Sequence, residues 1–173
     1  MLYIYIYICV CILIHIHTSQ FQEKTTKFIG VFLDETLSWK YHLISEKNKI
    51  SRALYGIKQV KKFLPKNSLK TLYLALIQPY ISYGILIWGN ANSSILQKTV
   101  SLQKRAIRIF NNEGYNNHTD PLLKNCEILK LSDMYQYHVC LFMDNFINKR
   151  LPISFDGLFR LNSEVQENRR VTS

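Results

Sequence analysis

Apolar residues between positions 43 and 64 recur at the spacing of an α-helix. Successive intervals of seven, four, three and seven residues separate Leu43, Ile50, Leu54, Ile57 and Leu64. At about 100° of rotation per residue, these side chains fall on one stripe roughly 80° wide. Pro65 would end the helix, because proline has no backbone N–H to donate. The sequence therefore predicts a helix from about Ser38 to Phe63 that buries a single apolar face.

Positive charge is concentrated in the middle of the chain. The 173 residues include 22 Lys and Arg against 12 Asp and Glu, a formal net charge of +10. Residues 24–110 hold 15 of the basic and three of the acidic side chains, whereas residues 1–23 and 111–173 each carry a net charge of −1. Such a balance favours a polyanionic partner. A binding surface is therefore expected in the middle of the chain.

The predicted helix carries a line of lysines beside its apolar stripe. By the same rotation, the flank between about 60° and 120° from Ile50 holds Lys40, Lys47, Lys58 and Lys62. Residues 40–70 contain nine basic side chains and one acidic one, Glu46. A solvated helix face is the plain alternative, but this density favours contacts with backbone phosphates. The predicted nucleic-acid-binding residues are Lys40, Lys47, Lys58, Lys61, Lys62, Lys66, Lys104, Arg105 and Arg108.

Shorter elements flank this helix. The apolar run Thr26–Leu33 predicts a strand or hairpin, with Gly30 marking a bulge or a close backbone approach. After Pro65, Asn67 or Ser68 can cap a helix that is apolar nearly all round and therefore belongs at the centre of the fold. Pro79 should kink that helix, which ends near position 88.

Three more helices are predicted downstream. One runs over residues 94–110 and places its basic residues on the half of the wheel away from the core. Asp120 and Pro121 give the N-cap and N1 signature of a short helix. Ser132 and Asp133 cap a longer, mostly buried helix that extends to about residue 148. The chain is therefore expected to be mainly α, with a β segment or hairpin at 24–37, four to five bundled helices at 38–160 and a polar tail at 161–173.

Residues 1–23 have a different character from the rest. Tyr and Ile alternate over positions 3–8, and Cys-Val-Cys follows at 9–11. A DNA repeat of AT read in triplets encodes Ile and Tyr in turn, and a repeat of TG encodes Cys and Val. We therefore interpret this low-complexity apolar segment as a translated simple repeat outside the fold. A membrane anchor at residues 2–16 is the alternative, although a span needs roughly 20 apolar residues and no basic region precedes this run.

The residues offer no recognisable catalytic or metal-binding pattern. Two-metal phosphoryl transfer needs converging carboxylates, and the neighbouring Asp34 and Glu35 lie at a predicted turn where their side chains diverge. The spacing of the possible metal ligands is not that of a zinc site: His118, Cys126, His138 and Cys140. Four unevenly placed Cys residues also indicate no disulfide framework, which favours a reducing, intracellular compartment. No catalytic residue, metal or cofactor is predicted.

Many short motifs nevertheless follow one another in the order of a known family. They include Lys27–Asp34, Leu37–Trp39, His42, Lys62–Pro65, Leu72–Tyr73, Pro79–Tyr80, Tyr83–Gly84, Trp88–Gly89, Leu102–Arg108, His118–Leu122 and Leu129–Leu131. Together they resemble the region after the polymerase palm in reverse transcriptases of non-LTR, LINE-like retrotransposons of the jockey type. The resemblance covers about residues 24–155, and its specificity comes from the agreement of many individually weak motifs.

The resemblance implies a role for each segment. Phe28, Ile29 and Gly30 would belong to a primer-grip-like strand or hairpin and would lie near a primer terminus. Residues 38–160 would form a thumb and connector. The thumb would pack against a palm, whose paired catalytic Asp residues should precede residue 24, where the alternating repeat lies instead. The leading hypothesis is a truncated thumb-like remnant that binds template-primer weakly through phosphates, takes no small-molecule substrate and cannot polymerise. A small membrane-associated protein and a polymerase subunit completed in trans are the alternatives.

Overall fold

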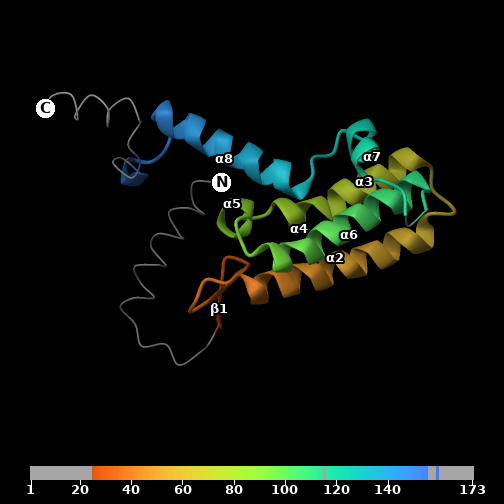
Figure 1. Cartoon of the computed structure of the whole chain (residues 1–173), viewed down its shortest axis with the longest axis horizontal. Helices are drawn as coiled ribbons and strands as arrows, with labels where there is room; N and C mark the ends of the chain where they lie inside the picture. Colours follow the sequence, from red (N-terminus) through yellow and green to blue (C-terminus); the bar gives the residue numbers. More distant parts are fainter. Residues whose placement is uncertain (1–24, 115, 156–158, 160–173) are drawn as a thin grey trace, which may run out of the picture.

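The computed structural model describes residues 25–114, 116–155 and 159, and Figure 1 traces the order of the elements. A hairpin comes first, formed by β1 (Thr25–Phe28) and β2 (Val31–Asp34). The helices that follow are α2 (Lys40–Val60), α3 (Lys66–Leu76), α4 (Gln78–Ser82), α5 (Ile85–Trp88), α6 (Ser93–Asn111), α7 (Asp120–Asn125) and α8 (Leu131–Ile147), before a 3-10 turn at Ile153–Phe155. The expected class, mainly helical with an N-terminal β element, is confirmed.

The N-terminal β element is a hairpin rather than one strand. β1 and β2 pair antiparallel, with Thr25 opposite Asp34 and Phe28 opposite Val31. Ile29 and Gly30 form the connecting turn, and both have positive φ angles, 42° and 83°. Two-residue hairpin loops with two positive φ angles match the twist of the strands that they join. Gly30 therefore lies in the tight turn of the hairpin and does not form a bulge within a strand.

α2 is shorter at both ends than the predicted 38–63. Before it, the Asp34 carboxylate accepts hydrogen bonds from the Ser38 N–H and the Ser38 hydroxyl, each at 2.8 Å. Burial raises the pKa of Asp34, but hydrogen bonds from Ser38 and Thr36 outweigh it and hold that pKa below its ordinary value. After Val60, the chain turns before Pro65. In a continuous helix the ring of Pro65 would clash with the carbonyl of Lys61, four residues earlier, which is consistent with the end of α2 at Val60.

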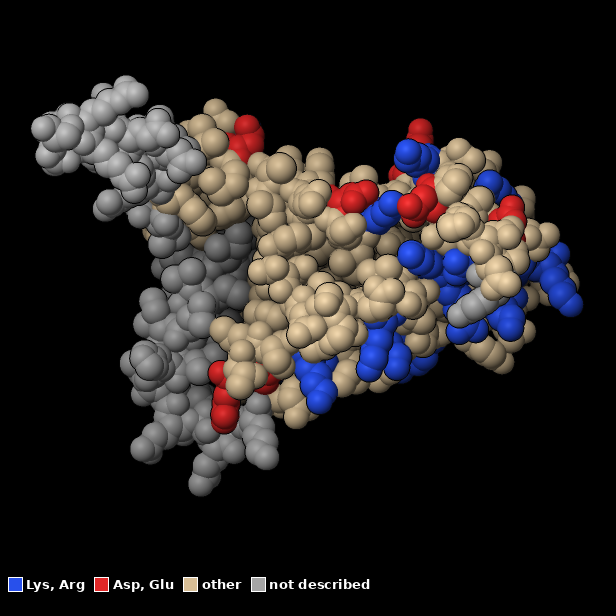
Figure 2. All heavy atoms as spheres, in the orientation of Figure 1, with Lys and Arg blue, Asp and Glu red and all other residues tan. Residues whose placement is uncertain are grey.

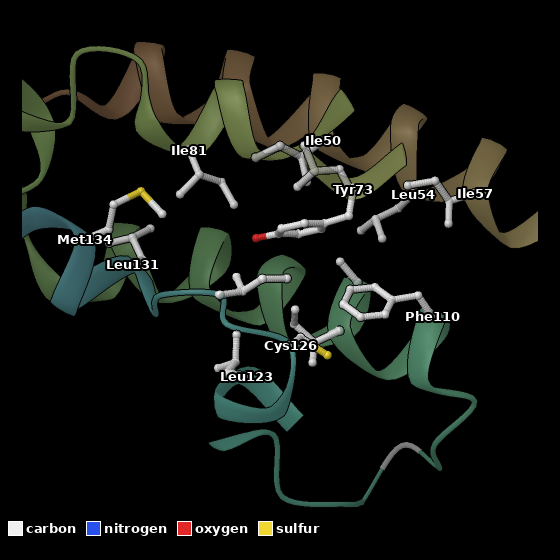
Figure 3. Packing of buried hydrophobic residues seen from close by; sticks show 14 of the residues in the cluster. Ile50, Leu54, Ile57, Tyr73, Ile81, Phe110, Leu123, Cys126, Leu131 and Met134 are labelled. Carbon is white, nitrogen blue, oxygen red and sulfur yellow. The ribbon is translucent and has the colours of Figure 1, made fainter. Parts of the chain in front are cut away.

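The hydrophobic core lies between α2, α3 and α6. Tyr73 of α3 is fully buried, and in Figure 3 its ring lies between Ile50 and Leu54 of α2 and Phe110 of α6. The Tyr73 and Phe110 ring centroids are 5.8 Å apart. Burial raises the pKa of Tyr73 to about 12, so its hydroxyl stays neutral and accepts a 3.3 Å hydrogen bond from Gln103. Four of the five residues of the predicted apolar stripe face this core, whereas Leu64 lies beyond the end of α2 and is exposed.

The segment after Pro65 forms three helices rather than one kinked helix. The breaks fall at Ile77, between α3 and α4, and at Gly84, whose φ is 64°. Pro79 lies in the first turn of α4, where its missing N–H costs no helical hydrogen bond. The segment does occupy the centre of the fold, although Leu74 and Leu76 are 44% and 45% exposed. Only one of its faces is therefore buried.

Three of the predicted helix caps are displaced. α3 begins directly after Pro65, so residues 67 and 68 fall within its first turn. α7 has Thr119 at its N-cap, which moves Asp120 and Pro121 one position into the helix. α8 begins after Lys130, so residues 132 and 133 also lie inside the helix. The shifts are one to three residues, and none of the three observed N-cap residues accepts a side-chain hydrogen bond from its helix.

α8 is only partly buried, contrary to the expectation of a mostly buried helix. Of its residues only Leu131, Met134 and Phe142 are buried. Figure 1 shows why: the helix leaves the bundle after its first turns and extends away from it. Within the bundle its main partner is α5, and farther along the helix Phe142 packs against Phe155 and Phe159.

No helix of the described residues combines the length and the apolar character needed to cross a bilayer. The anchor proposed for residues 2–16 lies outside the described residues. The same holds for the rest of the predicted repeat and for the tail at 161–173.

Candidate nucleic-acid interface

The lysine flank of α2 is retained over most of its predicted length. Lys40 begins the helix and Lys58 lies in its last turn, both exposed, and Lys47 between them is half-buried. At 1.5 Å per residue, the helix spans about 27 Å from Lys40 to Lys58. Figure 2 shows Lys and Arg side chains along the lower edge of this face, over α2, and around the end of the bundle at the right.

The acidic residue of α2 is paired and turned away from that flank. Glu46 is 4% exposed and accepts a hydrogen bond of 2.6 Å from the Nζ atom of Lys49. The same Nζ lies 5.3 Å from the centroid of the Tyr80 ring, on α4. Because 100° separates successive residues, Glu46 and Lys49 occupy the flank opposite Lys40. Lys49 thus neutralises the negative charge of Glu46. The flank with Lys40, Lys47 and Lys58 therefore carries only positive charge.

Lys62 lies beyond the helix, which corrects the prediction that it continues the flank. α2 ends at Val60, so Lys61 and Lys62 fall in the turn that follows. Lys66 begins α3 on the other side of this turn. These three lysines line one pocket together, at the end of the bundle away from the hairpin.

The predicted basic residues of α6 form a separate group. The Nε atom of Arg108 donates a hydrogen bond of 3.0 Å to the carbonyl of Asn117 in the loop before α7. A hydrogen bond from Lys130 lowers the pKa of Asp120, and the charge of Lys104 lowers it further. Lys104 and Arg108, both half-buried, therefore face the α7 side, while Arg105 is exposed. The nine predicted residues thus divide among the α2 flank, the end pocket and the α6 surface.

The primer-grip-like residues form the tip of the hairpin. Phe28 and Ile29 are 37% and 45% exposed, and Gly30 completes the turn. The hydroxyl of Tyr83 donates a hydrogen bond of 2.5 Å to the Ile29 carbonyl. A Cβ atom on Gly30 would lie 3.5 Å from the Tyr83 ring. Tyr83 therefore holds the tip of the hairpin from 54 residues away, a contact that no local pattern announces.

Asn111 and Asn112 were also missed by sequence reasoning. Both lie at the end of α6 and line the pocket that holds Lys61, Lys62 and Lys66. The Asn112 backbone is left-handed, with φ at 61°, and caps α6. A left-handed Asn near the end of a predicted helix is a common cap, but nothing in the sequence places it beside residues 61–66.

Within the described part of the chain, no three His, Cys, Asp or Glu residues gather closely enough to hold a metal ion. The thiols of Cys126, which is buried, and Cys140, which is exposed, are free.

The fold and surface define a basic helical module with a lysine flank, a lysine-lined pocket and an exposed hairpin tip. Two transposon proteins of Drosophila melanogaster are similar to it in sequence. The chain is 26% identical over 129 residues to "Probable RNA-directed DNA polymerase from transposon BS", and 24% identical over 92 residues to "Probable RNA-directed DNA polymerase from transposon X-element". The matches include 71% and 51% of this chain.

The chain spans only a small part of these relatives, 14% and 10% of their lengths. No family model and no solved structure matches the chain. The two similarities support an origin related to the reverse transcriptases of transposable elements, in agreement with the motifs in the sequence.

Proposed function

We propose that this chain corresponds to the thumb-like region of a retrotransposon reverse transcriptase and binds template-primer through backbone phosphates. In this proposal the region is a remnant that guides the nucleic acid and does not itself carry out polymerisation. The single observation that carries the proposal is the lysine flank of α2, in a chain similar to two RNA-directed DNA polymerases.

The geometry of the flank suits a nucleic-acid backbone. Its span of about 27 Å corresponds to roughly eight base pairs, because successive phosphates of a strand rise about 3.4 Å along a duplex. Glu46, the acidic residue of α2, is paired with Lys49 on the opposite flank. Contacts of this kind position a duplex without reading its sequence.

The hairpin tip supports a position near the strand end. β2 packs against α2, and in Figure 1 the hairpin lies beside the end of α2 that begins at Lys40. Ile29 is β-branched, exposed and held at a positive φ, a combination that costs conformational energy. Strained, exposed residues concentrate at binding sites. We therefore place the primer terminus near Ile29, with the duplex running along α2.

A salt titration tests the phosphate contacts. The full chain is titrated with a labelled RNA–DNA hybrid, and binding is followed by fluorescence anisotropy at several salt concentrations. We expect affinity to fall steeply with salt, because binding releases counterions. The triple change Lys40→Gln, Lys47→Gln and Lys58→Gln should reduce the slope of log affinity against log salt by about three, one for each lost contact.

A matched control removes three charges elsewhere: Arg52→Gln, Lys124→Gln and Lys149→Gln. Arg52 is exposed on α2, about 200° around the helix from Ile50 and away from the flank. The control should change the slope by less than about one. Equal slopes for the two triple variants, salt-independent binding, or nucleotide incorporation by the purified chain would each contradict the proposal.

A further inference from the structure

A pocket of about 510 Å³ lies at the end of the bundle where three elements meet. The turn after α2, the start of α3 and the end of α6 form its walls. Its lining residues are Lys61, Lys62, Leu64, Lys66, Leu69, Phe110, Asn111 and Asn112. The pocket thus combines three positive side chains with an apolar floor and two amides.

Among the described residues, no acidic side chain balances the positive charge of this pocket. Its lining includes no Asp or Glu, and the ion pairs of the described residues involve none of Lys61, Lys62 and Lys66. Three like charges around one pocket repel one another. An anion bound among them would relieve this repulsion and gain charge-assisted hydrogen bonds.

The floor of the pocket is built before any ligand arrives. Leu69 and Phe110 are each 3% exposed, so core packing fixes their positions. The Asn111 amide donates a hydrogen bond of 2.8 Å to the Ile107 carbonyl, which fixes that wall as well. Because these three residues are already held in place, binding has to order fewer side chains, and the entropic cost of binding an anion is lower.

We propose that this pocket binds a phosphate group of a nucleic-acid strand through the ammonium groups of Lys61, Lys62 and Lys66. The inference rests on the proposed function and adds a defined phosphate site to the lysine flank. The pocket lies about 30 Å along α2 from Lys40, the end nearest the hairpin. A strand that follows the flank from the hairpin therefore reaches the pocket. The phosphate is either a terminal monoester or an internal diester.

The test compares two double variants of the full chain. Lys62→Gln with Lys66→Gln removes two exposed pocket lysines, and Arg52→Gln with Lys149→Gln removes the same charge elsewhere. Circular dichroism confirms folding of both. We expect the pocket variant to bind a labelled single strand about tenfold more weakly than the original chain, and the control less than about threefold more weakly. Equal affinities of the two variants would overturn the inference.

A second probe separates this inference from the proposed function. Inorganic pyrophosphate is titrated while NMR follows the backbone amides of residues 61–64, 66, 111 and 112. The inference predicts shifts at these amides that disappear in the pocket variant. Binding of the hybrid through the α2 flank without these shifts would overturn the pocket and leave the proposed function standing. Shifts without any binding of nucleic acid would show a site for small anions only, and would overturn the proposed function together with the inference that a nucleic-acid strand occupies the pocket. Absence of both shifts and binding would also overturn both.

The source of the phosphate is identified by comparing the affinities of three versions of the same strand. One carries a 5′-phosphate, one carries a 3′-phosphate, and one has only hydroxyl ends. A preference for one phosphorylated end that the pocket variant loses assigns the site to a terminal monoester. Equal affinity for all three strands, again reduced in the pocket variant, assigns it to an internal diester.

Discussion

His42 is fully buried, and neither of its ring nitrogens has a hydrogen-bond partner. Its ring centroid lies 6.0 Å from that of Trp88, and its Nδ1 atom is 3.9 Å from a carboxylate oxygen of Glu46. Burial lowers the pKa of His42 to about 4, and the charge of Lys49 adds to the effect. The imidazole is therefore neutral in the folded protein at neutral pH and serves as a core side chain.

The low pKa of His42 predicts a stability that falls on mild acidification. Between pH 6.5 and about 4, the unfolded chain binds a proton at this residue that the folded protein does not, so the free energy of unfolding decreases as pH falls. The loss approaches about 1.4 kcal/mol per pH unit and reaches about 3 kcal/mol in total. Urea unfolding at pH 4.5, 5.5 and 6.5 measures it.

His42→Leu should flatten this pH dependence. Burial also lowers the pKa of His138, so that residue adds a slope of the same sign to both proteins. The difference between the two proteins therefore isolates His42. Identical slopes would mean that His42 is protonated equally in the folded and unfolded states.

At the scale of elements, the contact between α5 and α8 requires a glycine, which has no side chain, at position 89. Gly89 follows α5, and a Cβ atom there would overlap the Tyr135 ring of α8 and the carbonyl of Ile85. Backbone cannot move aside as a flexible side chain can. Gly56, in α2, presents the opposite case, because an added Cβ would meet no atom within 4 Å.

Alanine at the two glycines should have opposite effects. Gly89→Ala is expected to lower the free energy of unfolding by about 1–3 kcal/mol, the usual cost of overpacking. Gly56→Ala should raise it by about 0.5–1 kcal/mol, because alanine has the higher helix propensity. Urea unfolding of both variants compares them directly, and a neutral Gly89→Ala would show that α8 can move away from α5.

The whole molecule divides into a packed bundle and a helix that extends from it. Ile50, Leu54 and Ile57 of α2 are all buried at 3% exposure or less. In α8, by contrast, Tyr137 and Ile147 are 52% and 55% exposed. The lysine flank and the end pocket both belong to the packed part, so a bound strand would meet a rigid surface.

Hydrogen exchange should reveal this division. We expect the amides of residues 50–57 to exchange only through global unfolding, and those of residues 137–147 to exchange much faster through local opening, because few buried contacts hold them. Native-state exchange measured by NMR at increasing urea gives the opening free energy of each amide. Equal opening free energies in the two segments would show that α8 unfolds only with the bundle.

The fold was more predictable than the geometry of the candidate site. Helical spacing and the prolines located α2 and the break before α3, since both are local properties of the chain. The burial of α8 was predicted wrongly, because its apolar composition does not reveal how far it extends beyond its neighbours. The cap positions of α3, α7 and α8 were also missed, since these helices begin without a side-chain cap and the preference for capping side chains does not locate such a start.

Local patterns in the sequence were enough to locate most of the helical segments and the line of lysines on one flank of α2. Both are consequences of periodicity and charge within short stretches of chain, whereas the turn at Ile29 and Gly30 and the division of residues 66–88 into three helices were not predicted. The packing of the helices was needed to show that Tyr83 donates a hydrogen bond to the Ile29 carbonyl and that Lys61, Lys62 and Lys66 share a pocket with the end of α6. Such contacts join residues far apart in sequence, and they depend on how the helices pack, which local periodicity does not specify.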